Sequence, residues 1–142
     1  MCTVFAKKLH GLAVLPEHQT AGAAGFDLST VDPVDLYPGE RRLFKIGMAV
    51  QIPTRHGLLL LPRSGLASRG LVIPNAPALI DEDYRGPISV ILWNLSDDRI
   101  QLPVGSRVCQ GMLVPYTKAN FIWTDILTET DRGAGGFGST GV

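Results

Sequence analysis

The run Ile88-Ser-Val-Ile-Leu-Trp93 decides how the rest of the chain is interpreted. It is short, almost continuously apolar and rich in β-branched and aromatic residues, which is typical of a β-strand buried on both faces. A chain of 142 residues has little interior of that kind. We therefore predict a strand here, and we expect packing between copies of the chain to supply part of its burial.

Working outward, short apolar segments separated by turn residues recur on both sides of this run. Strands are predicted at Arg42–Ile52, Leu58–Leu61, Ile88–Asn94 and Arg107–Val114. The chain holds 16 glycines and 10 prolines, an excess that argues against a helical bundle. The fold class predicted is all-β, a barrel or a sandwich.

Two segments need a separate prediction. A short helix is expected at Ser64–Arg69, directly after Pro62. The longest stretch without glycine or proline is Tyr116–Arg132. A helix would give this stretch an apolar face, but its several threonines favour a strand, because branching at Cβ restricts side-chain rotamers in helices.

Charge and cysteine content exclude several classes of protein. With 13 basic and 13 acidic side chains the net charge is zero, which removes the main reason to expect a nucleic-acid partner. Cys2 and Cys109 cannot form a disulfide framework, and no cysteine–histidine cluster has zinc-ligand spacing. The N-terminus lacks signal-peptide organisation, and the apolar run Gly57–Leu61 is too short to span a membrane. We expect one cytoplasmic domain without a membrane partner.

The C-terminal segment Asp131–Val142 differs in composition, because five of its residues are glycine. One interpretation is a disordered tail. Arg132 and Phe137 favour another, since they offer an anion-binding group and a flat stacking surface among accessible backbone amides. The segment is then an arm that closes over a planar, anionic ligand.

Two internal segments carry further candidate chemistry. Pro62-Arg-Ser-Gly-Leu-Ala67 combines a guanidinium, a hydroxyl and backbone amides at a helix start, which suits a phosphate, although a plain turn is also consistent. Asn75–Gly86 contains three consecutive acids, Asp81–Asp83, followed by Tyr84. A solvated hairpin tip is one interpretation, and an acid that holds a water as general base is the other.

Two shorter pieces complete the set. Ala24–Leu28 places the carboxylate of Asp27 in a turn of small residues, and Arg107–Gly111 places an arginine and Gln110 on a strand. Cys109 lies between them without a neighbouring histidine, so it is interpreted as a packing residue rather than a nucleophile.

In this order and at these separations the five segments resemble the five motifs of the homotrimeric dUTP pyrophosphatases (dUTPases). The resemblance covers Ala24–Gly141, and the family's Arg-Gly-x-Gly-Gly-Phe-Gly-Ser-Thr-Gly motif is met at every fixed position by Arg132–Gly141. It implies a distorted jelly-roll-like β-barrel domain over residues 1–130, with at most one short helix, and a mobile C-terminal arm over residues 131–142.

The resemblance also implies a reaction and a set of roles. The activity would be hydrolysis of dUTP to dUMP and pyrophosphate, which keeps uracil out of DNA and supplies dUMP for thymidylate synthesis. Asp81 would orient the water that attacks the α-phosphorus, and Tyr84 would pack beneath the deoxyribose. The substrate-binding residues implied are Arg63, Ser64, Gly65, Asn75, Leu79, Ile80, Tyr84, Gln110, Arg132, Phe137, Gly138, Ser139 and Thr140.

The implied cofactor is Mg²⁺, bound mainly to the substrate phosphates and water, with Asp27 contributing only through a water molecule. The implied partners are dUTP and two further copies of the chain. In this family each site is shared between subunits and receives its arm from another chain, so a monomer would be inactive.

The chain departs from the family pattern at two positions. Ala78 stands where the family usually has glycine, and Gly111 interrupts a strand that is commonly apolar. The related dCTP deaminases carry a catalytic glutamate on the strand after the hairpin, whereas Ile88–Asn94 has no carboxylate. A non-catalytic nucleotide-binding trimer is the remaining alternative, although Asp81 and the arm residues are retained.

Overall fold

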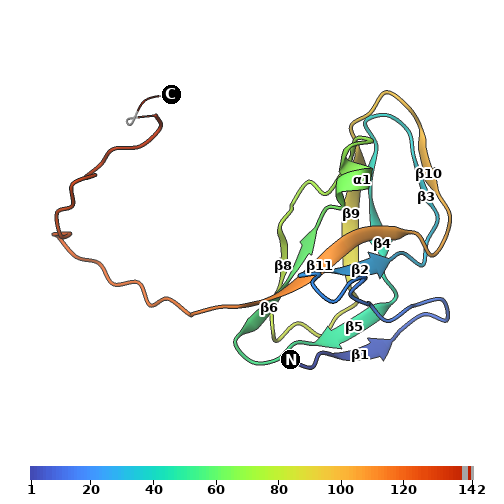
Figure 1. Cartoon of the computed structure of the whole chain (residues 1–142), viewed down its shortest axis with the longest axis horizontal. Helices are drawn as coiled ribbons and strands as arrows, with labels where there is room; N and C mark the ends of the chain where they lie inside the picture. Colours follow the sequence, from blue (N-terminus) through green and yellow to red (C-terminus); the bar gives the residue numbers. More distant parts are fainter. Residues whose placement is uncertain (139–140, 142) are drawn as a thin grey trace.

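The strands are short because glycine and proline interrupt the chain every few residues. The computed structural model describes residues 1–138 and 141. The one helix in them is α1 (Ser64–Ala67). The strands are β1 (Phe5–Lys8), β2 (Phe26–Ser29), β3 (Val34–Leu36), β4 (Arg41–Lys45), β5 (Met48–Gln51), β6 (His56–Leu61), β7 (Leu71–Val72), β8 (Ala78–Ile80), β9 (Ser89–Asn94), β10 (Ile100–Leu102) and β11 (Arg107–Pro115). The predicted class, all-β with one short helix, is confirmed (Figure 1).

Antiparallel pairing joins these strands into four sheets. The largest has the order β2-β11-β6-β8, the second has the order β4-β9-β7, and the pairs β1-β5 and β10-β3 complete the set. Within the described residues the sheets do not close into a barrel, so that part of the prediction is wrong. The predicted strand Arg42–Ile52 is interrupted at Gly47, whose φ is 80°. The chain turns at this glycine from β4 into β5, which belongs to a different sheet.

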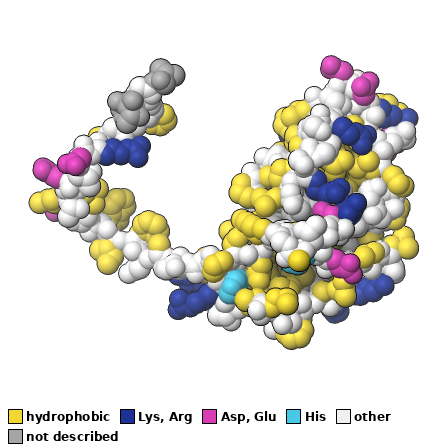
Figure 2. Space-filling view, in the orientation of Figure 1, with side chains coloured by type: hydrophobic (Ala, Val, Ile, Leu, Met, Phe, Trp, Pro, Cys, Tyr) yellow, Lys and Arg dark blue, Asp and Glu magenta, His cyan; other side chains and the backbone are white. Residues whose placement is uncertain are grey.

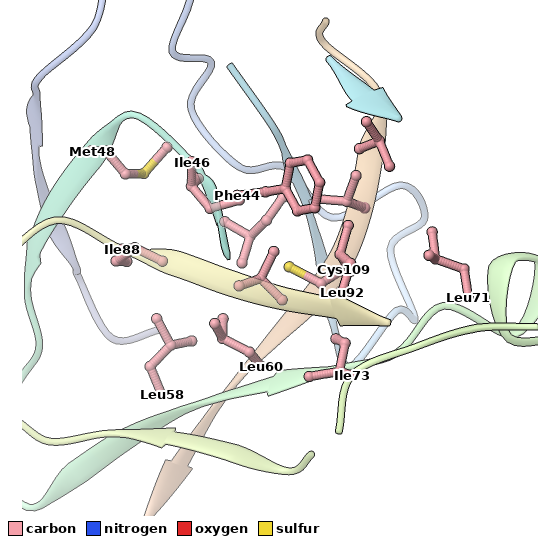
Figure 3. Close-up of a cluster of buried hydrophobic side chains, with 14 of the residues drawn as sticks. Phe44, Ile46, Met48, Leu58, Leu60, Leu71, Ile73, Ile88, Leu92 and Cys109 are labelled. Carbon is pink, nitrogen blue, oxygen red and sulfur yellow. The ribbon is translucent and has the colours of Figure 1, made fainter. Parts of the chain in front are cut away.

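The apolar run Ile88–Trp93 forms most of β9, and the two faces of this strand differ in burial. Its buried face carries Val90, Leu92 and Asn94, and its half-buried face carries Ser89, Ile91 and Trp93. Leu92 belongs to the buried cluster that also contains Phe44, Leu60 and Cys109 (Figure 3). In the single chain only one sheet face meets the core, and burial of the other face between copies of the chain stays a prediction.

Gly111 does not loosen β11 but makes its packing possible. A Cβ at this position would collide with the ring of Phe26 and lie 3.2 Å from Leu58 Cδ1. Ala78, the other departure from the family pattern, pairs with Leu60 and packs against the core. Both residues are therefore accommodated by the packing around them.

Asn94 is the largest fully buried polar side chain, and every hydrogen-bonding group on it is used. Its Nδ2 donates to the carbonyl oxygens of Leu36 at 3.0 Å and Asp98 at 2.7 Å. Its Oδ1 accepts from the backbone N–H of Ser96 at 2.9 Å and from the hydroxyl of Ser96 at 2.7 Å. The side chain thus ties the end of β9 to β3 and to the loop that follows.

An Asn94→Ala variant is expected to lose about 3 kcal/mol of stability, because buried carbonyl groups are left without donors. For a domain of this size that lowers the melting temperature by about 10 °C. Thermal unfolding at matched protein concentration measures it, with the exposed loop variant Asp97→Ala as control. A melting temperature equal to that of the control would contradict the prediction.

The stretch Tyr116–Arg132 contains neither strand nor helix, so the predicted strand is wrong. It leaves the end of β11 as an extended segment that runs away from the sheets (Figure 1). A strand needs a hydrogen-bonding neighbour, and among residues 1–138 and 141 none lies beside this segment. Within the described residues no helix is long and apolar enough to cross a membrane.

Candidate active site

A polar cavity of about 400 Å³ opens between α1, β2 and β11. Its lining is drawn from three segments that the sequence singled out, and one further residue: Asp27, Arg63, Ser64, Gly65, Leu66, Arg69 and Gln110. They meet because β11 pairs with both neighbours, so that Gln110 lies opposite Asp27 of β2 and opposite Leu61 at the end of β6. In Figure 2 basic side chains gather around an acidic one between α1 and β2.

Asp27 is the electrostatic centre of this cavity. Its Oδ1 accepts from Arg63 Nε at 3.0 Å, and its Oδ2 accepts from Arg107 Nη1 at 3.1 Å. Only 14% of the Asp27 side chain is exposed, so the carboxylate acts as an internal anchor for two guanidinium groups. Arg107 reaches this carboxylate from β11 but does not itself line the cavity.

Gln110 is held in place on the same strand. Its Nε2 donates to the carbonyl oxygen of Pro62 at 2.9 Å. A Cβ at Gly25 would lie 2.9 Å from Gln110 Oε1, so glycine is needed at that point of the turn before β2. The amide of Gln110 is therefore clamped between the turn and the start of the Pro62–Ala67 segment.

Ser64 and Gly65 present a hydroxyl and backbone N–H groups that are accessible for hydrogen bonds with a ligand. Both are exposed on the first turn of α1, where backbone N–H groups have no partner within the helix. No side-chain cap covers this end, and a Cβ at Gly65 would meet nothing within 4 Å. A serine hydroxyl and open amides thus border a cavity that arginines make electropositive, which is an arrangement suited to phosphate oxygens.

The second part of the predicted site is the segment Ala78–Gly86. Leu79 and Tyr84 are 62% and 44% exposed, and Asp81 is exposed beside them. The hydroxyl of Tyr84 donates to the carbonyl oxygen of Pro87 at 3.2 Å. A Cβ at Gly86 would collide with the Tyr84 ring, so this glycine keeps the ring in its position.

Glu82 anchors this segment, a role that the sequence analysis did not assign. Its carboxylate accepts a hydrogen bond from the backbone N–H of Arg55. Partial burial raises the pKa of Glu82, but hydrogen bonds from Arg55 and from the hydroxyl of Tyr116 contribute to holding it below its ordinary value. The acid beside Asp81 is thus a structural link between the turn before β6 and the end of β11.

The single chain keeps the two parts of the site apart. Ile80 lies opposite Leu58 in β6, whereas Gln110 lies opposite Leu61, so the segment bearing Asp81 and the cavity lie at different ends of that strand. Neither Asp81 nor Tyr84 lines the cavity. Asn75 is exposed in the loop before β8 and does not line it either.

The arm residues lie apart from both parts. Phe137 is fully exposed at a φ of 50°, and Arg132 Nε donates to the carbonyl oxygen of Gly135 at 2.9 Å. Gly138 is exposed as well. The predicted contacts of Ser139 and Thr140 lie outside the described residues. Figure 1 shows the described part of the arm, residues 131–138, at the end of the extended segment and separated from the sheets.

Two further expectations concern metal and thiol chemistry. Among the described residues no group of three or more histidine, cysteine, aspartate or glutamate side chains could hold a metal ion. Cys109 is completely buried, and burial raises its pKa to about 12. The interpretation of Cys109 as a packing residue rather than a nucleophile therefore agrees with the structure.

The folded protein is expected to react with a thiol reagent such as Ellman's reagent at Cys2 only, because Cys2 is exposed and Cys109 is buried. One equivalent of reactive thiol in buffer and two in denaturant would agree with this prediction; two in the folded protein would contradict it.

The raised pKa of Cys109 also makes the stability of the fold depend on pH. The buried thiol contributes stability below pH 9, and this contribution is lost as the pH rises toward 12, because the unfolded chain releases the proton first.

Comparison with known proteins finds a matching family, similar sequences and similar structures. The dUTPase family model matches residues 12–141. A deoxyuridine 5'-triphosphate nucleotidohydrolase of Nautilia profundicola is 43% identical over 95% of this chain and 96% of its own length. The enzyme of the same name from Methylocella silvestris is 47% identical over 98% and 91%. The structure of a Staphylococcus bacteriophage 80alpha dUTPase with dUPNHPP superimposes with a TM-score of 0.92 at 27% identity, covering 100% of both chains.

Proposed function

Because this chain belongs to the dUTPase family and is a hydrolase of dUTP, we propose that it acts by in-line attack of an Asp81-activated water on the α-phosphorus. The water oxygen forms the new bond to phosphorus while the bond to the bridging oxygen breaks. Pyrophosphate leaves with the electron pair, and Asp81 takes the proton of the water. Positioning and charge stabilisation dominate such a reaction.

The nucleoside is proposed to bind at the segment Ala78–Gly86. Backbone groups of Leu79 and Ile80, together with Asn75, recognise the uracil edge in a slot without room for a 5-methyl group. Tyr84 packs beneath the deoxyribose and excludes a 2′-hydroxyl. The fixed hydroxyl of Tyr84 and the glycine that accommodates its ring support this role.

The phosphate chain is proposed to bind at the cavity. Ser64, the amide of Gly65 and Gln110 hold it there, with Arg63 contributing positive charge. From the arm, Arg132 and the segment Gly138-Ser139-Thr140 hold the terminal phosphate, and Phe137 stacks over the base. The single observation that carries the proposal is the convergence of a serine hydroxyl, open amides and arginines on one cavity.

Magnesium is proposed to enter with the substrate, as the Mg²⁺–dUTP complex. The donor set agrees, because the described residues offer no carboxylate cluster and both oxygens of Asp27 already accept from arginines. Asp27 would contribute to holding the ion only through a water molecule. The charge of the ion would offset that of the phosphates.

We propose a homotrimer in which each site takes parts from different subunits, with residues 1–130 as the folded domain and residues 131–142 as a mobile arm. The separation of Asp81 from the cavity along β6 supports it. So do the large apolar side chains that the extended segment leaves uncovered in one chain. They are Phe121 at 93% exposure, Ile122 at 79%, Trp123 at 102%, Ile126 at 82% and Leu127 at 81%.

The proposed role is to keep uracil out of DNA and to supply dUMP, in the cytoplasm where free nucleotides are available. The test is release of pyrophosphate, with and without Mg²⁺, from dUTP, dCTP, dTTP and UTP in parallel. Release confined to dUTP that requires Mg²⁺ would agree. Equal release from dTTP would contradict the proposed uracil slot, and ammonia from dCTP would indicate the deaminase chemistry.

A further inference from the structure

The cations around the cavity differ in how much of their hydrogen-bonding capacity is already used. Arg63 donates from Nε to Asp27 and, at 2.9 Å, from Nη1 to the carbonyl oxygen of Arg107. Arg107 donates from Nη1 to Asp27 and, at 3.2 Å, to Gln19 Oε1. One carboxylate therefore holds both guanidinium groups and offsets part of their charge.

Arg69 lines the same cavity and is exposed. Within the part of the chain that the structure describes, it forms no ion pair and no side-chain hydrogen bond. Motif spacing does not select Arg69 as a binding residue, because it follows the motif segment Pro62–Ala67 by two residues. Of the two arginines that line the cavity, it is the one whose charge is not already directed at a protein carboxylate.

The backbone at Arg69 is firmly held, so the side chain projects from a fixed base. Its N–H donates to the carbonyl oxygen of Leu66 at 3.0 Å. Gly70 follows at a φ of 85°, and a Cβ there would lie 2.9 Å from the backbone nitrogen of Ser96. The N–H of Leu95 donates to the carbonyl oxygen of Gly70 at 2.8 Å. This close approach locks the turn after α1 against the loop after β9.

We propose that Arg69 is a substrate-binding residue that pairs with the phosphate chain, whereas Arg63 is mainly a positioning residue that shapes the cavity through Asp27. The inference rests on the proposed binding of the phosphate chain at this cavity. A guanidinium with free donors matches the geometry of phosphate oxygens and keeps its charge at all relevant pH values. Arg69 lines the same cavity as Ser64 and Gly65.

The test compares Arg69→Gln with Arg99→Gln, whose guanidinium pairs with Asp35 and does not line the cavity. Arg69→Gln is expected to raise the KM for dUTP and the Kd for inorganic pyrophosphate about tenfold, while the melting temperature stays unchanged. Arg69→Lys is expected to recover part of the loss. Arg63→Gln is expected to lower the melting temperature, because Asp27 loses a partner in a mostly buried position.

Unchanged KM and pyrophosphate affinity in Arg69→Gln would overturn the inference. A lowered melting temperature of Arg69→Gln together with the loss of affinity would also overturn the inference, because a damaged fold would then explain the weaker binding. Pyrophosphate binding by calorimetry separates this inference from the proposed reaction. If the unmodified protein binds pyrophosphate through Arg69 but releases none from dUTP, the inference stands and the proposed reaction fails.

Discussion

Replacing Asp81 by asparagine is expected to lower kcat for dUTP by about a thousandfold, because the amide cannot accept the proton of the attacking water. The side chains have nearly the same shape, and Asp81 is exposed, so the fold should be unaffected. KM should change by much less than kcat, since the loss falls on the transition state. Steady-state pyrophosphate release with Mg²⁺ measures both constants.

The chain supplies a matched control two residues along the same turn. Asp83 is also an exposed aspartate, so Asp83→Asn removes the same charge without touching the proposed base. We expect it to stay within about threefold of the unmodified protein. Equal activity of the two variants would show that Asp81 does not act as the general base.

Mixing two inactive variants is expected to restore activity, which is the second large effect. The first variant is Asp81→Asn, and the second ends at Thr130 and lacks the arm. If the hairpin and the arm of one site come from different subunits, about a quarter of the sites in randomly mixed trimers contain both intact parts. Activity should therefore rise from nearly zero to about a quarter of the unmodified level.

The two variants are mixed by unfolding and refolding them together, so that their chains combine at random in the proposed trimer. A mixture of Asp81→Asn with a chain that carries both changes is the control, since no site in it has an intact Asp81. Size-exclusion chromatography with light scattering verifies the trimer. A refolded mixture without any gain would show that each chain builds its own site.

The positions of the longest strands could be predicted from the sequence, but those of short strands such as β3, β7 and β10 could not, and neither could the pairing partners. Short apolar segments bounded by turn residues predicted strands close to β6, β9 and β11. The apolar run at Ile88–Trp93 suggested burial on both faces, although Ile91 and Trp93 remain half-buried in the single chain. Burial depends on which sheet covers a face, and local sequence does not contain that information.

The extended segment illustrates the same limit. Tyr116–Arg132 has the composition of a strand, but a strand forms only where another edge supplies hydrogen bonds. The segment leaves β11 with no such edge beside it in the part of the chain that the structure describes. The β-propensity of the segment allows it to form a strand, but it does not supply the neighbouring strand edge that pairing requires.

The chemistry of the candidate site was present in the sequence, because functional groups are properties of residue types. Asp81, Ser64, Gln110 and Phe137 could be selected from motif spacing alone. Their relation in space could not: pairing in β11 brings Gln110 to Asp27 and Pro62, and the register of β6 keeps Asp81 away. Only the folded chain distinguishes Arg63, held by Asp27, from Arg69, which lines the cavity without such a partner. Residue identity determines which charges exist, whereas long-range strand register determines which of them neutralise one another.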